Sequence, residues 1–396
     1  MPLTFDFVVD RVVRGKLWPS LAKHVAEPYT QSWREFGKHW PFVVPLRLQE
    51  YCEQHGMAIN AYSIDQDFPT TAFYPIALAF FNFEIDYFEL VPLDVMAKIK
   101  QQRLRVLFYY HEGDNPERIK HRLDNLCIKN KLEIDCYRFI SSNTSADQLP
   151  GFIYFGDSEL WYWQRNRHID PVPIRYTAKN KEFTVLSRLH KPWRATIMTE
   201  LFQEDVLNNS YWSYGAGPYD MPDSENPIEV DAIRGLRLNI KKFLAGAPYT
   251  CDNLSSDQHN DHSLVVPEHF ADSYCNIVLE THFDADQSSG TLVSEKTYKP
   301  IKHGQLFVVA GPAGTLAELR SCGYRTFDSV IDNGYDQENN NTQRWLLLKK
   351  TIKNLQQNLP DMFQQCKDDI VYNQQLFVKS KIERLNSLHK KLYENC

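Results

Sequence analysis

Residues 274–323 contain the feature that most constrains the fold, a regular alternation of apolar runs and helical patterns. The run YCNIVLET (274–281) predicts a buried strand, and SEKTYKPIKHG (294–304) predicts a short helix that ends at Gly304. QLFVVAG (305–311) predicts a second strand, and AGTLAELRSCG (313–323) predicts a helix that ends at Gly323. Alternation of this kind indicates an α/β fold with a parallel sheet.

A cation stands at the start of the first of these helices. Ser294 predicts an N-cap, so Lys296 falls in the first turn, where the partial positive charge of the helix disfavours it unless an anion is bound. For the triplet alone, a solvated Lys296 beside Glu295 is the simpler explanation. Ligands of parallel sheets lie beyond the carboxyl ends of the strands, where Glu280 would emerge, so the setting favours phosphate. Pro300 removes a backbone amide and should kink or shorten the helix.

The N-terminal half alternates in the same way and predicts a second Rossmann-like domain. Expected strands cover 57–64, 104–113 and 133–142, and expected helices cover 45–56, 94–102 and 116–131. The polar stretch 165–182 carries two prolines and suits an interdomain linker. We therefore expect a first domain over 1–170, a second over 171–345, and a helical tail over 346–396 that is interrupted at Pro360 and is long enough to return to the first domain.

Composition narrows the class of protein. A chain of 396 residues with 43% hydrophobic and 24% charged residues is long enough for two globular domains. A net charge of -6 without a basic patch argues against nucleic acid as a partner. The longest apolar run, 73–81, is too short to cross a bilayer, and the eight cysteines lack paired spacing, so we expect a cytoplasmic protein with reduced thiols. The lysines of the tail favour a solvated helix face over contact with an anionic membrane.

Clusters of potential metal ligands are weak in this sequence. The stretch 257–269 gathers His259, Asp261, His262, Glu268 and His269, but it reads as a polar loop without helical register. Two Asp-x-Asp triplets, at 65–67 and 284–286, are patterns that occur often by chance. We therefore expect neither a metal nor another cofactor.

These C-terminal motifs resemble the donor-binding half of nucleotide-sugar glycosyltransferases of the GT-B fold. The likeness rests on an acidic residue after a strand, Ser-Glu-Lys, a Pro-bearing helix, an apolar strand ending in Gly, and the GY-TF pattern at 323–327. FTVLSRLHKPWRATIMTELFQ (183–203) is similar to a segment in which an arginine opens a helix after a strand. The likeness is strongest to the alpha-1,3-fucosyltransferases and looser to the exostosin-like enzymes. It implies two Rossmann-like domains facing each other across a cleft, the first binding the acceptor and the second the donor.

The resemblance also implies roles for individual residues. Arg194 and Lys296 would hold the donor pyrophosphate, and Glu295 would meet the nucleotide, with Ser294 and Glu280 beside them. Arg188, at the end of the preceding strand, is the alternative candidate for the arginine that holds the pyrophosphate. The family usually has a tyrosine three residues before this glutamate, whereas position 292 is Leu, which leaves the identity of the donor open.

Sugar transfer also needs a base that takes the proton from the acceptor hydroxyl. Glu112 follows a predicted strand and is the preferred candidate, ahead of Asp114 and His111. Asp114 or Asn115 would instead serve as the N-cap of the helix that begins at Pro116. The resemblance implies an inverting, metal-independent hexosyl- or fucosyltransferase-like enzyme with a nucleotide-sugar donor and a glycan or glycolipid acceptor. The alternative is a non-catalytic protein of the same fold that binds a nucleotide or phosphate ligand, and a metal-dependent hydrolase is disfavoured.

Overall fold

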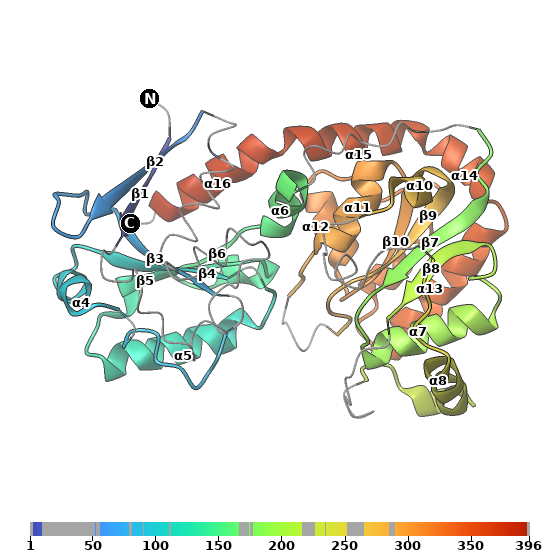
Figure 1. Ribbon diagram of the computed structural model, residues 1–396, viewed down its shortest axis with the longest axis horizontal. Helices are drawn as coiled ribbons and strands as arrows, with labels where there is room; N and C mark the ends of the chain where they lie inside the picture. Colours follow the sequence, from blue (N-terminus) through green and yellow to red (C-terminus); the bar gives the residue numbers. More distant parts are fainter. Residues whose placement is uncertain are drawn as a thin grey trace. The chain divides into compact units, whose positions relative to one another are not determined.

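The chain forms two compact α/β units (Figure 1). The computed structural model describes residues 3–9, 52, 56–78, 81–89, 91–110, 112–165, 174, 177–215, 226–233, 235–251, 265–284 and 290–393. Unit 1 comprises Met1–Leu160, Gln287–Leu292 and Ser380–Cys396, and unit 2 comprises Trp161–Asp286 and Val293–Lys379.

Unit 1 is built around a six-stranded sheet in which every paired strand is parallel, in the order β2-β1-β3-β4-β5-β6. The strands are β1 (Thr4–Val9), β2 (Ala58–Ser63), β3 (Phe73–Leu78), β4 (Arg105–Tyr110), β5 (Tyr137–Ser141) and β6 (Phe152–Tyr154). The helical segments are α4 (Leu93–Lys100), α5 (Pro116–Lys129), η3 (Ile134–Cys136), η4 (Thr144–Gln148), the start of α6 (Asp157–Arg165), and α16 (Lys381–Tyr393).

The last helix, α16, completes the core of unit 1. Leu385, Leu388 and Leu392 are buried in one cluster with residues of β1 and β4. At the start of this helix, the buried ammonium of Lys381 lies 2.6 Å from the carboxylate of Glu159. Arg384 pairs with the same carboxylate, and these two cations hold the pKa of Glu159 at about 2 against the opposing effect of burial.

Unit 2 contains a four-stranded parallel sheet in the order β10-β9-β7-β8. Its strands are β7 (Lys181–Ser187), β8 (Ser210–Tyr214), β9 (Ser273–Leu279) and β10 (Leu306–Ala310). Its helical segments are α7 (Pro192–Gln203), η6 (Val230–Ala232), α8 (Leu236–Ala245), α10 (Pro267–Ala271), α11 (Glu295–His303), α12 (Thr315–Ser321), η7 (Gly334–Gln337), α13 (Asn341–Gln356), α14 (Leu359–Gln365) and α15 (Lys367–Lys379).

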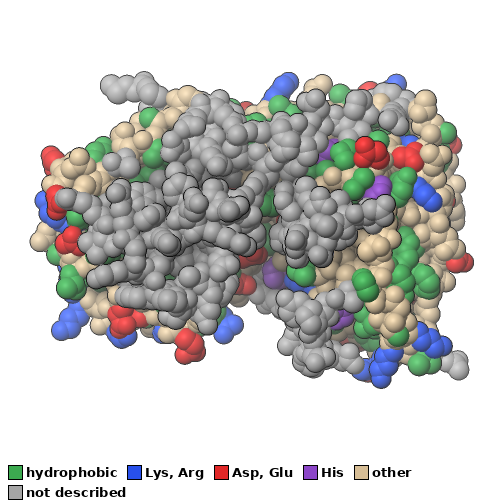
Figure 2. All heavy atoms as spheres, viewed as in Figure 1, with side chains coloured by type: hydrophobic (Ala, Val, Ile, Leu, Met, Phe, Trp, Pro, Cys, Tyr) green, Lys and Arg blue, Asp and Glu red, His purple; other side chains and the backbone are tan. Residues whose placement is uncertain are grey.

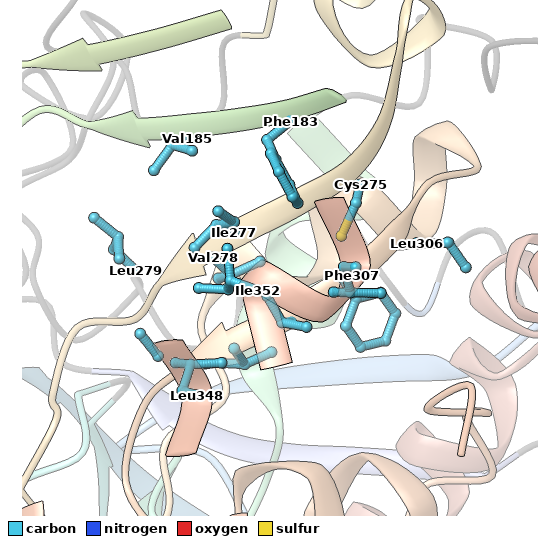
Figure 3. Packing of buried hydrophobic residues seen from close by; sticks show 14 of the residues in the cluster. Phe183, Val185, Cys275, Ile277, Val278, Leu279, Leu306, Phe307, Leu348 and Ile352 are labelled. Carbon is cyan, nitrogen blue, oxygen red and sulfur yellow. The ribbon is translucent and has the colours of Figure 1, made fainter. Parts of the chain in front are cut away.

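Helices cover both faces of this sheet. Figure 1 shows α7 and α13 on one face and α11, α12 and α15 on the other. Every residue of β9 and β10 is buried, as expected for strands covered on both faces. Figure 3 shows Leu348 and Ile352 of α13 in one buried cluster with residues of β9, among them Ile277 and Val278.

The helix α11 forms as the sequence predicts. The Ser294 hydroxyl accepts from the Lys296 amide, and Gly304 adopts the left-handed conformation (φ 69°) that ends the helix. A side chain at Gly304 would also collide with Ile174 at 2.8 Å. Pro300 lies inside the nine-residue helix, so it is tolerated there.

The predicted fold class is confirmed, since both units are α/β with parallel, Rossmann-like sheets. The strands predicted over 57–64, 104–113, 133–142 and 274–281 correspond to β2, β4, β5 and β9. The helix expected over 45–56 and most of the expected linker lie outside the described residues. Near Pro360 one helix ends at Gln356 and the next begins at Leu359, as predicted.

The described surface carries charges of both signs. Acidic and basic side chains are interspersed on the face shown in Figure 2. Within the described ranges, no helix is both long and apolar enough to span a bilayer.

Candidate active site

The candidate site lies at the carboxyl ends of β7 and β9, which are neighbours in the sheet of unit 2. The chain passes from β7 to β8 on one side, and β9 then pairs on the other side of β7. This reversal makes the β7–β9 junction a topological switch point, where open α/β sheets bind their ligands. Arg188 and Arg194 follow β7, and Glu280 follows β9, so the sequence-predicted residues of both loops belong to this junction.

Arg194, in the first turn of α7, links the segments that follow β7 and β9 through hydrogen bonds. The side chain is 3% exposed, and its Nη1 donates to the Leu189 carbonyl at 3.3 Å. Its Nη2 donates to the carbonyl of Leu279 at 3.3 Å and to that of Glu280. Nε is buried without a hydrogen-bond partner, so its N–H is not used by the described part of the chain. Burial lowers the pKa of Arg194 to about 10, and the side chain stays charged at neutral pH.

Glu280 organises the start of α11. The residue is fully buried, and its Oε1 accepts from the Ser294 amide at 3.1 Å and from the Thr297 hydroxyl at 2.5 Å. Oε2 accepts from the Thr281 amide at 3.0 Å. Because three protein donors occupy this carboxylate, Glu280 fixes the loop and the helix N-terminus rather than offering oxygens to a donor.

Lys296 lies over the N-terminus of its own helix. Its Nζ is 3.0 Å from Glu295 Oε1, 3.2 Å from Thr281 Oγ1 and 3.3 Å from Ser294 Oγ. The side chain is 26% exposed, so the ammonium is held by the protein and is also accessible. The structure therefore brings Ser294, Glu295 and Lys296 together with Glu280 in one turn.

Lys191 and His282 belong to the same site, although the sequence analysis did not single them out. Lys191 Nζ donates to the Thr281 carbonyl at 2.5 Å. Burial first, and then the charges of Lys191, Arg194 and Lys296, lower the pKa of His282 to about 4, so its imidazole is neutral at pH 7. A sequence signal for Lys191 did exist, because it immediately precedes Pro192, the first residue of α7. This is the same placement of a lysine at a helix start that identified Lys296.

Arg188 is half-buried in the loop after β7, and its positive charge contributes to the lowered pKa of Arg194. The backbone here is closely packed, because a side chain at Gly215 would lie 1.9 Å from the Arg188 carbonyl oxygen. Arg188 is therefore a fourth cation at the junction. Four basic side chains and the N-termini of α7 and α11 at one sheet edge are suited to binding a polyanion.

Glu112, the predicted base, lies in unit 1, whereas the four cations belong to unit 2. It follows β4 and is half-buried, and its charge contributes to the raised pKa of Tyr110, for which burial is the main cause. The Tyr110 hydroxyl donates to Asp114, and the Asn115 side chain accepts from the Arg118 amide at 3.1 Å. The helix cap is thus Asn115, and Asp114 serves Tyr110. His111 lies outside the described residues.

No group of three or more potential metal ligands occurs among the residues that the structure describes. His259, Asp261 and His262 lie outside those residues. His269 stacks on Tyr211 with ring centroids 4.2 Å apart, and its Nδ1 is 3.9 Å from the Cys251 sulfur.

No protein-family model matches this chain, and no curated protein matches it. Similar solved structures include the T4 phage BGT in complex with UDP and Mn2+, at 11% identity over 98% of this chain and 99% of that chain, with a TM-score of 0.36. The DNA modifying enzyme beta-glucosyltransferase, studied with and without uridine diphosphoglucose, is 10% identical over 100% of both chains, with a TM-score of 0.39. A glycosyltransferase from Rickettsia africae ESF-5 is 11% identical over 100% of both chains, with a TM-score of 0.33. None of these three is named as a fucosyltransferase or an exostosin-like enzyme, and at TM-scores this low the likenesses support no inference about this chain.

Proposed function

We propose that this chain is a glycosyltransferase that moves a sugar from a nucleotide-diphosphate donor to a hydroxyl group of a glycan or glycolipid acceptor. The observation that carries the proposal is the convergence of Arg188, Lys191, Arg194 and Lys296 at the switch point of unit 2. Glu280 and Glu295 offset only part of this positive charge. A diphosphate supplies the missing anion, and the two units would act as the halves of a GT-B fold.

In the proposed reaction, the acceptor oxygen attacks the anomeric carbon and the bond from that carbon to the diphosphate oxygen breaks. The bonding electrons pass to the diphosphate, and the proton of the acceptor hydroxyl passes to Glu112. A single displacement of this kind inverts the anomeric configuration. Fixed cations stabilise the charge that develops on the leaving diphosphate, so the reaction is proposed to proceed without a metal.

The roles within the cation group differ. Lys191 and Lys296 would contact phosphate directly, since each is a flexible point charge at a helix start. Arg194 holds three carbonyls and would contribute its charge and the N–H of Nε. Glu280 would keep the amides of α11 in place, and Glu295 would meet the nucleotide.

The test is a binding titration with GDP, UDP, ADP and CMP. We expect one nucleoside diphosphate to bind and to raise the midpoint of thermal unfolding, because a ligand at a hundredfold excess over Kd adds about 2.7 kcal/mol of stability. Lys296→Ala should weaken this binding by about 10- to 100-fold, the loss expected for a charged hydrogen bond. Lys367→Ala is the control, because Lys367 is an exposed lysine in the first turn of α15.

Failure of every nucleoside diphosphate to bind, or equal binding by Lys296→Ala and the wild type, would contradict the proposal. Transfer and donor hydrolysis are then measured in the presence of a chelator. A protein that binds the diphosphate but turns over no donor would instead be the non-catalytic binding protein that the sequence left as the alternative.

A further inference from the structure

The stretch Gln287–Leu292 belongs to unit 1, whereas the residues immediately before and after it belong to unit 2. Its described part is Gly290–Leu292, which we call segment 290–292. Thr144 forms hydrogen bonds with both the amide and the carbonyl of Thr291. The Thr144 amide donates to the Thr291 carbonyl at 3.1 Å, and the Thr291 amide donates to Thr144 Oγ1 at 3.0 Å. Thr144 Oγ1 also donates to Thr291 Oγ1 at 3.3 Å. The segment is therefore fixed in register by a single threonine.

Glycines allow this segment to approach closely. A side chain at Gly290 would lie 2.2 Å from Asn143 Oδ1, and a side chain at Gly113 would lie 2.7 Å from Leu292 Cβ. Asn143 is fully buried and donates through Nδ2 to the Gly113 carbonyl at 2.8 Å. The segment 290–292 thus packs on the loop that carries Glu112, and Leu292 fills the place against Gly113.

The same segment leads directly to the cation group. Leu292 is followed by the buried Val293 and then by Ser294, whose amide donates to Glu280. From Thr291 to Ser294 the chain has three residues, which span at most about 11 Å. Both ends of this stretch are held by hydrogen bonds, Thr291 to Thr144 within unit 1 and Ser294 to Glu280 within unit 2. One short path of chain therefore links the neighbour of the proposed base to the cap of α11.

We propose that Thr144 and Asn143 are positioning residues for the transfer reaction, and that they act through segment 290–292 on the Glu112 loop and on the first turn of α11. This inference rests on the proposed function. Neither residue is assigned contact with the donor. Their contribution is to hold segment 290–292, which packs on the Glu112 loop and immediately precedes the chain that enters α11.

The test compares Thr144→Val, which removes the hydroxyl that accepts from Thr291, with Thr144→Ser, which retains it. For Thr144→Val we expect kcat for sugar transfer to fall about tenfold, because a displaced reacting group slows the reaction while binding contacts survive. The Kd for the nucleoside diphosphate should stay within about threefold of wild type, since Glu280 still holds the start of α11. Thr144→Ser should resemble the wild type. Gly290→Ala, which collides with Asn143, should reproduce the loss in kcat and serves if Thr144→Val does not fold.

Hydrogen exchange of the protein without ligand gives a readout that does not depend on activity. In Thr144→Val the amides of Val293 and Ser294 should exchange at least about fivefold faster than in Thr144→Ser, because Thr291 loses its bonds to the Thr144 hydroxyl and keeps only the one to the Thr144 amide. Unchanged exchange at these amides, or a kcat equal to that of Thr144→Ser, overturns the inference. So does a rise in Kd as large as the fall in kcat. If the wild type binds no nucleoside diphosphate, the proposed function fails, and the exchange rates alone still decide whether segment 290–292 is coupled to Thr144.

Discussion

In unit 1 the first strand, β1, lies between β2 and β3, and in unit 2 the first strand, β7, lies between β8 and β9. The four strands of the unit 2 sheet therefore follow the same order as the first four strands of the unit 1 sheet, which has β5 and β6 in addition. The segments at the carboxyl ends nevertheless differ in chemistry. The described loops after β4, β5 and β6 carry Glu112, Asn143 and Asp157. The loop after β7 and the first turn of α7 carry basic residues. Of these, Lys191 donates to the Thr281 carbonyl and Arg194 to the carbonyls of Leu279 and Glu280. The same topology thus supports two kinds of site, and the loops decide which.

The way each unit holds its charges differs as well. In unit 1, tyrosines of β4 donate hydrogen bonds to nearby carboxylates, the Tyr109 hydroxyl to Asp157 at 2.5 Å and the Tyr110 hydroxyl to Asp114. In unit 2, Arg194 donates to neutral backbone carbonyls, and the nearby carboxylates of Glu280 and Glu295 offset only part of the positive charge of the group. This contrast predicts that substitutions at the edge of unit 1 change the chemical step, whereas those at the edge of unit 2 change binding or stability.

The largest expected effect is that of Glu112→Gln in unit 1. Loss of the base should reduce sugar transfer by about 10²- to 10⁴-fold. The affinity for the nucleoside diphosphate should be unchanged, because unit 2 supplies the cations. Single-turnover transfer and calorimetric binding measure the two quantities. Glu117→Gln is the control, since Glu117 is exposed in the first turn of α5. Transfer at the wild-type rate by Glu112→Gln would remove Glu112 from the mechanism.

The second expected effect is a loss of stability in Arg194→Ala. The buried carbonyls of Leu279 and Glu280 lose their donor, as does the carbonyl of the exposed Leu189. Each buried carbonyl left without a donor costs about 1 to 3 kcal/mol, so the free energy of unfolding should fall by about 2 to 6 kcal/mol. Urea unfolding monitored by tryptophan fluorescence measures it. Lys191→Ala should lower nucleotide affinity more than stability. If Arg194→Ala keeps wild-type stability and loses only nucleotide binding, Arg194 contacts the nucleotide directly and does not stabilise the fold.

The smallest expected effect concerns pH. His303 of α11 is 1% exposed, and burial, followed by Lys302 and Lys299, lowers its pKa to about 3. Below pH 6.5 the unfolded chain protonates this imidazole while the folded chain does not, so stability falls as the pH falls. At about 1.4 kcal/mol per pH unit, the loss reaches about 2 kcal/mol at pH 5.

Thermal unfolding at pH 7.5 and pH 5 tests this expectation. His303→Gln should lose less stability than the wild type between these two pH values, and His389→Gln in unit 1 provides the comparison. The carboxylate of Glu159 in unit 1 has a lowered pKa, so its contribution is lost only below about pH 4.5, the usual pKa of glutamate. Equal acid sensitivity of His303→Gln and the wild type would contradict the prediction.

Much of the fold followed from the sequence because its signals are local. The apolar runs of β9 and β10, the Ser294 cap and the Gly304 stop each act within a few residues. The strand β3 was not predicted, and Pro75 in its middle argues against a central strand. β1 pairs with β3 only at Phe73, so the proline lies where this ladder has already ended.

The site was predicted less completely than the fold. The sequence marked Arg194 as an arginine at a helix start and Glu280 as an acidic residue after a strand, but not the groups that they bind. The partners of Arg194 include carbonyls about 85 residues away, and backbone groups carry no signature in the sequence. Lys191 had the same signal as Lys296, whereas the lowered pKa of His282 depends on three neighbours that only the folded chain brings near.

The position of α16 in unit 1 has a consequence for how the chain is made. The ribosome releases all of unit 2 before it releases residues 380–396, which supply Leu385, Leu388 and Leu392 to the core of unit 1 and the cations for Glu159. During translation, unit 1 therefore has an uncovered apolar surface, and Glu159 has not yet met Lys381 and Arg384. Unit 2, by contrast, can already complete its fold. A nascent chain stalled near residue 379 would expose that surface to chaperones and proteases.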